Sequence, residues 1–125
     1  MPSLPTRDTV VCLDSSSERL RKLQTRLEVE HIEATCTQSA SNCLEITAEC
    51  HPKAVLLDAN FLRVDQESIP EYIARISLST AVLLMVDDPE RWRHKKPPFV
   101  QEVVRRGDLD LIVSLLRQIG QSARS

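Results

Sequence analysis

The chain has 125 residues, of which 42% are hydrophobic and 27% charged, and its formal net charge is −2. This length suits one domain with a single hydrophobic core, and the small net charge gives no overall attraction to nucleic acid or to a membrane surface. Because no basic N-terminal stretch is followed by an apolar one, and no run approaches about 18 apolar residues, we expect no signal peptide, no membrane span and a cytoplasmic location.

The first predicted elements are a buried strand and an amphipathic helix. Residues 9–13 (TVVCL) are rich in β-branched and apolar side chains, which predicts a strand that ends at Asp14. The stretch that follows repeats leucine at helical spacing on one face. Since Ser15 and Glu18 have the spacing of a capping box, the helix is predicted to start at Ser15.

A second strand, a second helix and a third strand follow. Residues 31–36 (HIEATC) alternate in the manner of a strand with one buried face. Residues 39–50 predict a helix, which Pro52 closes. The run KAVLLDANF then predicts a strand over residues 54–57, whose apolar side chains lead directly into one carboxylate, Asp58.

The next segments predict a short helix, a fully buried strand and a basic crossover. Residues 69–76 form a helix with a proline in its first turn, and residues 81–86 (AVLLMV) are apolar throughout, which is typical of a strand covered on both faces. In the segment DDPERWRHKKPP, Asp88 can cap a helix of about two turns that Pro97 stops. This pattern does not decide whether residues 87–98 form a helix at all.

The last strand and helix complete the predicted fold. Residues 99–104 predict a weaker fifth strand, and Asp108 can cap a final helix whose apolar stripe ends at Gly120. Apolar strands separated by amphipathic helices indicate a doubly wound α/β fold, with a five-stranded parallel sheet between two layers of helices. We therefore predict one domain over residues 1–125, with its core at residues 7–120 and tails at residues 1–6 and 121–125.

The strand ends predict where a site would lie. In a doubly wound sheet, ligands bind beyond the carboxyl ends of the strands, near the point where the strand order reverses. The residues delivered to that edge are Asp14, Asp58, Val86 and Arg105. Asp58 therefore lies where this architecture places chemistry.

Other kinds of site have little support. Four cysteines, Cys12, Cys36, Cys43 and Cys50, form no C-x-x-C pair and are interpreted as reduced thiols packed as small apolar groups. The three histidines have no partner at zinc-ligand spacing. With only two glycines in the chain, a Gly-rich phosphate-binding loop is excluded. We expect no independent enzyme activity.

Three stretches carry a resemblance to a known family. VVCLDSS at the first strand, HPKAVLLDAN at the third and VVRRGDLDLIVSLLRQI at the end are similar to the corresponding parts of bacterial response-regulator receiver domains, and the resemblance covers nearly the whole chain. It implies a flavodoxin-like, receiver-type fold with three α/β/α layers. It also implies a phosphoprotein of a two-component phosphorelay, acting as a single receiver domain through separate partners.

The resemblance gives the strand-end acids a role. Receivers accept a phosphoryl group on the aspartate that ends the third strand, which corresponds to Asp58. They bind Mg²⁺ with that aspartate, an acidic pair after the first strand and a backbone carbonyl two residues past the acceptor, which correspond to Asp14–Ser15 and Asn60. Since Ser15 replaces one carboxylate, the implied Mg²⁺ site is weak, and Ser15 is either a further ligand or the helix cap.

The parts that transmit a phosphorylation signal depart further from the family. The hydroxyl residue after the fourth strand corresponds to Val86, which cannot donate a hydrogen bond to a phosphoryl group, and the aromatic switch residue corresponds to Glu102. The family's lysine corresponds to Arg105, which would contact a phosphoryl group or pair with Asp58 in the resting state. A lysine–proline pair at Lys96 lies too close to Val86 to leave room for a helix and another strand.

Two functions remain open from the sequence. In the first, the chain is an atypical receiver whose Asp58 accepts phosphate from a histidine kinase or a phosphotransfer protein and which signals to a downstream protein target. In the second, it is a pseudo-receiver that is never phosphorylated and acts as a constitutive protein-interaction module. The first function needs Mg²⁺ at Asp58, whereas the second tolerates a salt bridge in that place.

A partner surface is predicted in the last third of the chain. Basic residues beside a tryptophan occur in surfaces for nucleic acid or an acidic partner, but a solvated segment with the tryptophan folded onto the core is the simpler interpretation. In receivers, the fourth helix, fifth strand and fifth helix commonly form the dimer or partner surface, so we expect a protein partner or a homodimer rather than nucleic acid or a membrane. The predicted contact residues are Arg91, Trp92, Arg93, Lys95, Lys96, Leu111 and Leu115.

Overall fold

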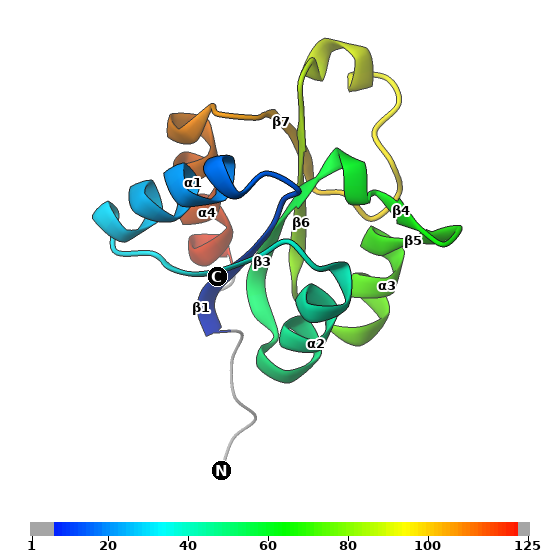
Figure 1. Ribbon diagram of the computed structural model, residues 1–125, viewed down its shortest axis with the longest axis horizontal. Coiled ribbons are helices and arrows are strands. Elements are labelled where there is room, and N and C mark those ends of the chain that lie inside the picture. Colours follow the sequence, from blue (N-terminus) through cyan, green and yellow to red (C-terminus); the bar gives the residue numbers. More distant parts are fainter. Residues whose placement is uncertain (1–6, 123–125) are drawn as a thin grey trace.

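Five parallel strands form the central sheet of the computed structural model, which describes residues 7–122 (Figure 1). The order across the sheet is β2-β1-β3-β6-β7, and every neighbouring pair runs parallel. The strand bounds are Arg7–Leu13 (β1), Glu33–Thr37 (β2), Pro52–Asp58 (β3), Ala81–Val86 (β6) and Glu102–Arg105 (β7). The strand order reverses at β1, because the chain moves outward to β2 and then returns to β3 on the other side. The predicted doubly wound fold is confirmed.

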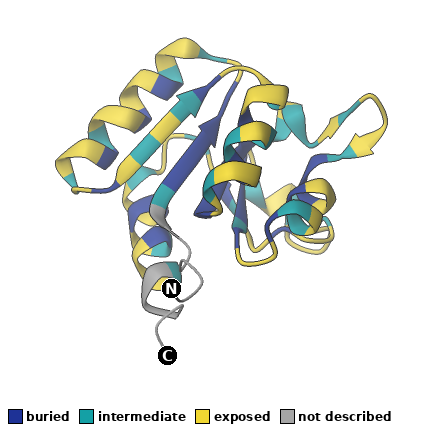
Figure 2. Cartoon of the chain, turned by 90° about the horizontal axis from the view of Figure 1, so that it is seen from below, coloured by how far each residue is buried: buried dark blue, intermediate teal, exposed yellow. Residues whose placement is uncertain are grey.

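Two helices pack on each face of this sheet. The helix bounds are Ser17–Val29 (α1), Ala40–Cys50 (α2), Ile69–Ile76 (α3) and Leu109–Ser122 (α4). α1 and α4 share one apolar core with the sheet, and α2 and α3 share the other. A pleated strand sends successive side chains to opposite faces, so β1 places Val10 and Cys12 in the first core and Val11 and Leu13 in the second. Figure 2 shows buried strands between helices whose outer faces are exposed.

The first three helices begin at serine caps, and the cap of α1 differs from the prediction. The Ser16 hydroxyl accepts a hydrogen bond from the backbone N–H of Arg19 at 3.2 Å, so α1 is capped by Ser16 and not by Ser15. This shift of one residue releases the Ser15 hydroxyl, which donates to Asp58 instead. The predicted starts of α2 and α3 agree with the structure.

The fourth crossover, between β6 and β7, contains no α-helix. A single 3₁₀ turn, η2 (Pro89–Trp92), follows Asp88, whose carboxylate accepts a hydrogen bond from the N–H of Glu90 at 3.2 Å. The segment 87–98, for which the sequence left a helix of about two turns open, therefore forms no α-helix. The local capping groups are used as expected, but the segment offers little beyond Trp92 for burial, and a helix without an apolar face gains little from packing.

Two strands start later than predicted, in each case after a residue in the left-handed region. β7 begins at Glu102 and not at Phe99, whose φ of +68° is incompatible with a regular strand. β2 begins at Glu33 and not at His31, whose φ of +61° turns the chain after α1. A periodic apolar pattern carries no information on such single-residue conformations, so the predicted bounds were too early.

A short hairpin between β3 and α3 was not predicted. It follows the 3₁₀ turn η1 (Ala59–Phe61) and consists of β4 (Arg63–Val64) and β5 (Glu67–Ser68). Its two turn residues, Asp65 and Gln66, have φ values of +51° and +67°. Such turns are usually recognised in a sequence by an Asn-Gly or Asp-Gly pair, and this one lacks the glycine.

The ends of the chain differ slightly from the predicted tails. α4 continues to Ser122 and therefore past the predicted end at Gly120. The predicted N-terminal tail at 1–6, and residues 123–125 of the predicted C-terminal tail, lie outside the described residues. Within the described part of the chain, no helix has both the length and the apolar character needed to cross a bilayer.

Candidate functional site

Two carboxylates meet at the carboxyl edge of the central strands. Asp14 follows β1 and Asp58 ends β3, and these strands are neighbours in the sheet. The register pairs Leu13 with Leu57, so that both acids reach the same edge. Asp14 is 2% exposed and Asp58 is 0% exposed. Charged groups buried to this extent require partners, because an isolated buried charge is strongly unfavourable.

Hydrogen-bond donors surround both oxygens of the Asp58 carboxylate. Oδ2 accepts from the backbone N–H of Ser15 at 3.1 Å and from the Ser15 hydroxyl at 3.0 Å. Oδ1 accepts from the backbone N–H of Asn60 at 3.1 Å and pairs with Nη2 of Arg106 at 2.6 Å. Ser15 is therefore neither the helix cap nor, in this arrangement, a metal ligand: it is a donor to Asp58.

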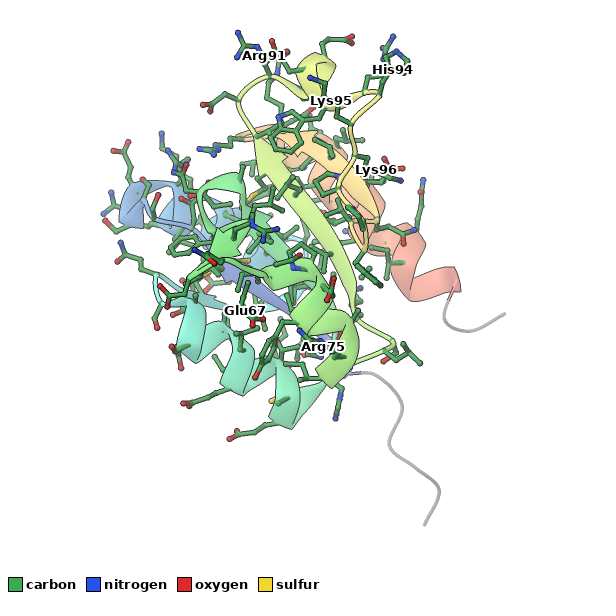
Figure 3. All side chains as sticks on the ribbon, turned by 90° about the vertical axis from the view of Figure 1, so that its right-hand side faces the viewer. Glu67, Arg75, Arg91, His94, Lys95 and Lys96 are labelled. Atoms are coloured by element: carbon green, nitrogen blue, oxygen red, sulfur yellow. The ribbon has the colours of Figure 1, made fainter. Side chains whose placement is uncertain are left out.

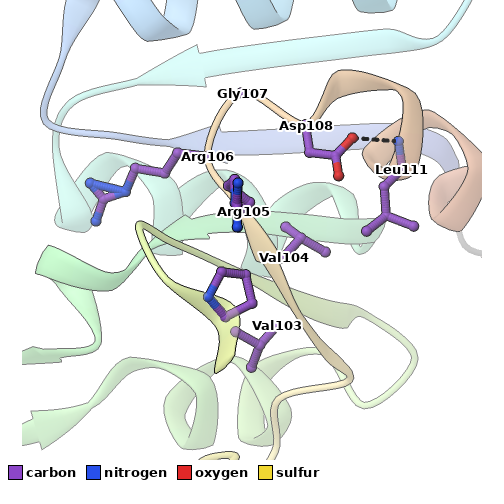
Figure 4. Close-up of a pocket in the computed structure, with 8 residues that line it drawn as sticks. Val103, Val104, Arg105, Arg106, Gly107, Asp108 and Leu111 are labelled. Atoms are coloured by element: carbon purple, nitrogen blue, oxygen red, sulfur yellow. Dashed lines mark hydrogen bonds between the residues drawn. The ribbon is translucent and has the colours of Figure 1, made fainter. Parts of the chain in front are cut away.

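Arg106, and not Arg105, pairs with Asp58. β7 ends at Arg105, the register partner of Val86, and the backbone N–H of Arg106 donates to the Val86 carbonyl at 2.8 Å. Figure 4 shows the two arginine side chains leaving the chain in different directions. Neighbouring residues of a strand point to different sides, so an error of one residue changes the partner. The prediction that Arg105 pairs with Asp58 is corrected accordingly.

A second arginine, which the sequence analysis missed, binds the other acid. Arg19 contacts Asp14 with two nitrogens, Nε to Oδ2 at 3.0 Å and Nη2 to Oδ1 at 2.8 Å. This bidentate geometry is the strongest that an arginine and a carboxylate form. The same Nη2 lies 3.6 Å from Oδ2 of Asp58. The sequence contained a weak signal for this contact, because Arg19 is in the first turn of the helix that directly follows Asp14.

The donors around Asp58 keep its carboxylate ionised. Burial alone raises the pKa of Asp58, but the backbone N–H groups of Ser15 and Asn60, the Ser15 hydroxyl and the Arg106 charge favour the ionised form by more, so that the pKa lies below its ordinary value. The hydrogen bonds with Asp14 raise the pKa of Arg19. The site therefore contains two negative and two positive charges.

The donor set does not fit the Mg²⁺ site that the resemblance implies. Mg²⁺ requires oxygen ligands at about 2.0–2.1 Å in octahedral geometry. Nη2 of Arg19 already contacts both acids, Asp14 at 2.8 Å and Asp58 at 3.6 Å, where a cation bridging them would have to lie. Among residues 7–122, no group of three or more His, Cys, Asp or Glu side chains is arranged to hold a metal ion. Asn60 directs its backbone N–H at Asp58, and its carbonyl alone does not complete a site.

The two positions that would transmit a signal lack the necessary groups. Val86 is 2% exposed and packs in the apolar core beside α2 and α3. Glu102, at the aromatic switch position, is exposed at the start of β7. Neither side chain provides a donor that is held near Asp58, so the geometry adds no receptor for a phosphoryl group there.

The cysteines are free thiols, as predicted. Cys12 and Cys36 are register partners on β1 and β2, and Cys43 is a buried residue of α2. Burial raises the pKa of Cys43 to about 11, and a thiol that is protonated at neutral pH is a poor nucleophile. Cys12 and Cys43 belong to the two cores, and Cys36 packs against the first of them.

The residues predicted for a partner surface are only partly exposed. Trp92 packs on the core shared with α2 and α3, which agrees with the simpler interpretation, and Leu115 packs on the other core. Leu111 is 42% exposed, and Arg93 pairs with Glu90 at 2.9 Å. Figure 3 shows the basic side chains of the fourth crossover gathered on one side of the molecule, with labels on Arg91, His94, Lys95 and Lys96.

No protein-family model and no curated protein sequence matches this chain. Solved structures match it over nearly its full length. A signal receiver domain of an HD domain-containing protein from Pseudomonas fluorescens Pf-5 is 18% identical, with a TM-score of 0.75 and coverage of 99% of this chain and 94% of that one. A sensor protein from Polaromonas sp. JS666 is 17% identical, with a TM-score of 0.75 and coverage of 94% and 98%.

A two-component response regulator from Clostridium difficile matches in the same way. It is 10% identical, with a TM-score of 0.76, and the match covers 95% of this chain and 100% of that one. At such identities the likeness concerns the fold. The chain has the flavodoxin-like fold of response-regulator receiver domains, as the resemblance implied.

Proposed function

We propose that this chain is a pseudo-receiver, a receiver-type domain that is not phosphorylated and acts as a constitutive protein-interaction module. The observation that supports it is the state of Asp58. The carboxylate has no exposed area, and both of its oxygens are held by Ser15, Asn60 and Arg106. Of the two functions that the sequence leaves open, a filled site favours this one.

Phosphoryl transfer to Asp58 is opposed at its first step. The carboxylate oxygen has to approach the phosphorus in line with the leaving group, and a cation has to neutralise the developing charge. Here the approach requires Arg106 to leave its carboxylate, and separating one partner from a buried ion pair costs about 3–5 kcal/mol. A divalent cation would in addition have to displace the Arg19 guanidinium from Asp14 and Asp58.

The conformational switch that a phosphoryl group drives in receivers is opposed as well. In receivers a hydroxyl after the fourth strand binds the phosphoryl group, and such a hydrogen bond to a charged acceptor contributes about 1.5–3 kcal/mol. Val86 contributes none. Driving a two-state equilibrium from 1:99 to 99:1 requires about 5.5 kcal/mol of differential interaction, so the loss of this donor removes a large part of the driving force for switching.

The two arginines give the site a structural role under this proposal. Arg19 connects α1 to the acids at the ends of β1 and β3, and Arg106 connects β3 to the chain that leads from β7 into α4. Both connections are made by side chains of the chain itself. The surface formed by η2, β7 and α4 is therefore held in one arrangement, which suits a partner that binds at all times.

The partners follow from this arrangement. A histidine kinase, a phosphotransfer protein or a downstream target of a bacterial two-component system would be bound as a protein, without transfer of a phosphoryl group and without an enzyme activity of this chain. We assign the contact to the surface of η2, β7 and α4, where the exposed predicted residues are Arg91, Arg93, Lys95, Lys96 and Leu111.

The test is intact-mass measurement after incubation with a small phosphodonor and Mg²⁺. An ordinary receiver labelled under the same conditions is the positive control, and Asp58→Ala is the matched negative control. We expect no adduct on the wild-type chain. A Mg²⁺-dependent phosphoryl adduct that disappears in Asp58→Ala would replace the proposal by the alternative, an atypical receiver with Asp58 as acceptor.

A further inference from the structure

Two of the four cysteines are neighbours across one edge of the sheet. Within the described part of the chain, β2 pairs only with β1, and the register between them is unbroken from Thr9 to Leu13. Cys12 and Cys36 are partners in this register. Their side chains lie on the same face, because Cys12 is part of the core beside α1 and α4 and Cys36 packs against that core.

The backbone holds these two residues at a separation that a disulfide can bridge. Neighbouring strands lie about 4.7–4.9 Å apart, and the Cα atoms of disulfide-bonded cysteines are usually about 4.4–6.8 Å apart. The Cβ atoms of parallel register partners are separated by nearly the strand spacing, which slightly exceeds the usual ~3.5–4.5 Å of a disulfide. Closure therefore needs a small movement of the edge strand. A strained bond of this kind is easily reduced, which suits a reversible modification.

The two thiols differ in access and acidity. Cys12 is 0% exposed, whereas Cys36 is partly exposed, with its Sγ 4.0 Å from the Leu20 carbonyl of α1. The hydrogen bond between the two thiols lowers the pKa of Cys36 and raises the pKa of Cys12. Because reactive cysteines combine solvent access with a lowered pKa, Cys36 is the sulfur that an oxidant reaches first.

The other two cysteines are placed elsewhere. Cys43 and Cys50 both belong to α2, which packs on the opposite face of the sheet. Burial raises the pKa of Cys43 to about 11. All four thiols are free in the structure, and only Cys12 and Cys36 are paired by strand register.

We propose that Cys12 and Cys36 form a redox-responsive pair that a hydroperoxide converts into a disulfide. The Cys36 thiolate attacks the terminal oxygen of the hydroperoxide, so that an S–O bond forms, the O–O bond breaks and the leaving oxygen takes up a proton. Cys12 then attacks the sulfur of the Cys36 sulfenic acid. An S–S bond forms, the S–O bond breaks, and the hydroxide leaves as water with the proton of Cys12. The two thiols lose two electrons, which the hydroperoxide gains.

The bond would fix the edge strand next to the ion-paired acids. Just beyond the cysteines, the N–H of Asp14 donates to the Thr37 carbonyl at 3.3 Å, and Nε2 of Gln38 donates to the Ser15 carbonyl at 2.9 Å. Ser15 is in turn a donor to Asp58. Oxidation therefore ties together the strand ends that carry these contacts, and the site becomes more rigid under oxidising conditions.

The test is intact-mass measurement of the full chain, reduced, freed of reductant and then exposed to hydrogen peroxide. We expect the loss of two hydrogens, which dithiothreitol restores. Fragmentation of the cross-linked tryptic peptides should place the bond between Cys12 and Cys36. Amide hydrogen exchange over residues 33–37 should slow in the oxidised chain, because the edge strand can no longer separate from β1.

Single variants test the order of the two steps. Cys12→Ser should form no disulfide, and dimedone should trap the sulfenic acid on Cys36. Cys36→Ser should give neither the disulfide nor the dimedone adduct. Cys50→Ser removes the other partly exposed thiol and is the matched control, which should oxidise as the wild type does. Circular dichroism shows whether each variant is folded, and the peptide map of the wild type tests the pair without any variant.

Three results would overturn the inference. The wild-type mass would stay unchanged in peroxide that oxidises free cysteine, the new bond would include Cys43 or Cys50, or Cys36 would be oxidised to a sulfinic acid with no disulfide. The inference does not depend on the proposed function. A phosphoryl adduct on Asp58 contradicts the pseudo-receiver alone, and the absence of the disulfide contradicts the thiol pair alone.

Discussion

Nη2 of Arg106 lies 2.6 Å from Oδ1 of Asp58, and the two side chains are only 13% and 0% exposed. The carboxylate that the resemblance matches to the phosphate acceptor of receivers is thus held in an internal ion pair. Arg19 repeats the arrangement on Asp14. Since two guanidinium groups supply the positive charge that a metal ion would bring, the acids at this edge of the sheet are satisfied without any ligand.

Removal of the Asp58 carboxylate should destabilise the fold and create a site for a small anion. Asp58→Ala removes the buried partner of Arg106 and leaves it only the exposed Asp87 at 3.6 Å; loss of one member of a buried ion pair costs about 3–5 kcal/mol. The N–H donors of Ser15 and Asn60 remain in place, so formate should restore part of the loss. Urea unfolding in sodium formate and in sodium chloride of equal ionic strength measures this effect.

The exposed Asp88 provides the matched control, since Asp88→Ala should respond alike to both salts. A gain in stability of Asp58→Ala that is the same in formate and in chloride would contradict the anion site.

Acid should unfold the chain partly through Asp58. Because the folded-state pKa of this carboxyl is lowered, the unfolded state binds more protons between the two pKa values, and stability rises with pH there. The contribution is complete above the unfolded pKa of about 3.9 and is lost as the pH falls through the lower folded value. The free energy of unfolding, measured by urea from neutral pH to about pH 2.5, should therefore fall less steeply for Asp58→Asn than for the wild type.

Glu30 gives a control outside the site. Its pKa is lowered too, mainly by the hydrogen bond from Arg26 and then by that from Arg117. In Glu30→Gln the free energy of unfolding should therefore also fall less steeply with acid. The contributions of the two acids should add, since they lie in separate networks. If the free energy of unfolding fell with acid at the same slope in the wild type and in Asp58→Asn, the partners of Asp58 would not lower its pKa.

The neighbouring serines should respond differently to alanine. Ser16→Ala removes the cap on the Arg19 N–H and should cost about 0.5–2 kcal/mol. Ser15→Ala removes a donor to a charged carboxylate, which contributes about 1.5–3 kcal/mol. Only Ser15→Ala should raise the pKa of Asp58. The free energy of unfolding of this variant should therefore fall less steeply with acid than that of the wild type. If the free energy of unfolding of Ser15→Ala fell with acid as steeply as that of the wild type, the Ser15 hydroxyl would not donate to Asp58.

The sequence predicted best those elements that burial alone specifies. β6 and α3 match the predicted ranges 81–86 and 69–76, because a continuous apolar run and a regular apolar stripe each require a covered face. The crossover after Asp88 was left open for the opposite reason. Its caps, proline and charge order are local signals for a helix, whereas the helix itself depends on packing that the segment cannot provide.

The site was predictable in its acids but not in its cations. Strand ends fix the positions of Asp14 and Asp58, so topology alone brought them together. The choice between Arg105 and Arg106 depends on a single position at the end of β7, where neighbouring residues point to different sides. The contact of Arg19 is made across a turn between strand and helix, and an arginine in a first helical turn is too common to indicate such a pair.

Replacement of Arg19 should open the edge of the sheet to a divalent cation. Arg19→Ala removes the nitrogen that contacts Asp14 and Asp58, and Ser15→Asp adds a carboxylate beside them. The double variant should gain thermal stability with added Mg²⁺, because a ligand that binds only the folded state stabilises it by mass action. The wild type and Arg21→Ala, a change on the exposed side of the same helix, should show no such gain. A Mg²⁺-dependent rise of equal size in the wild type would show that Arg19 does not occupy the metal position.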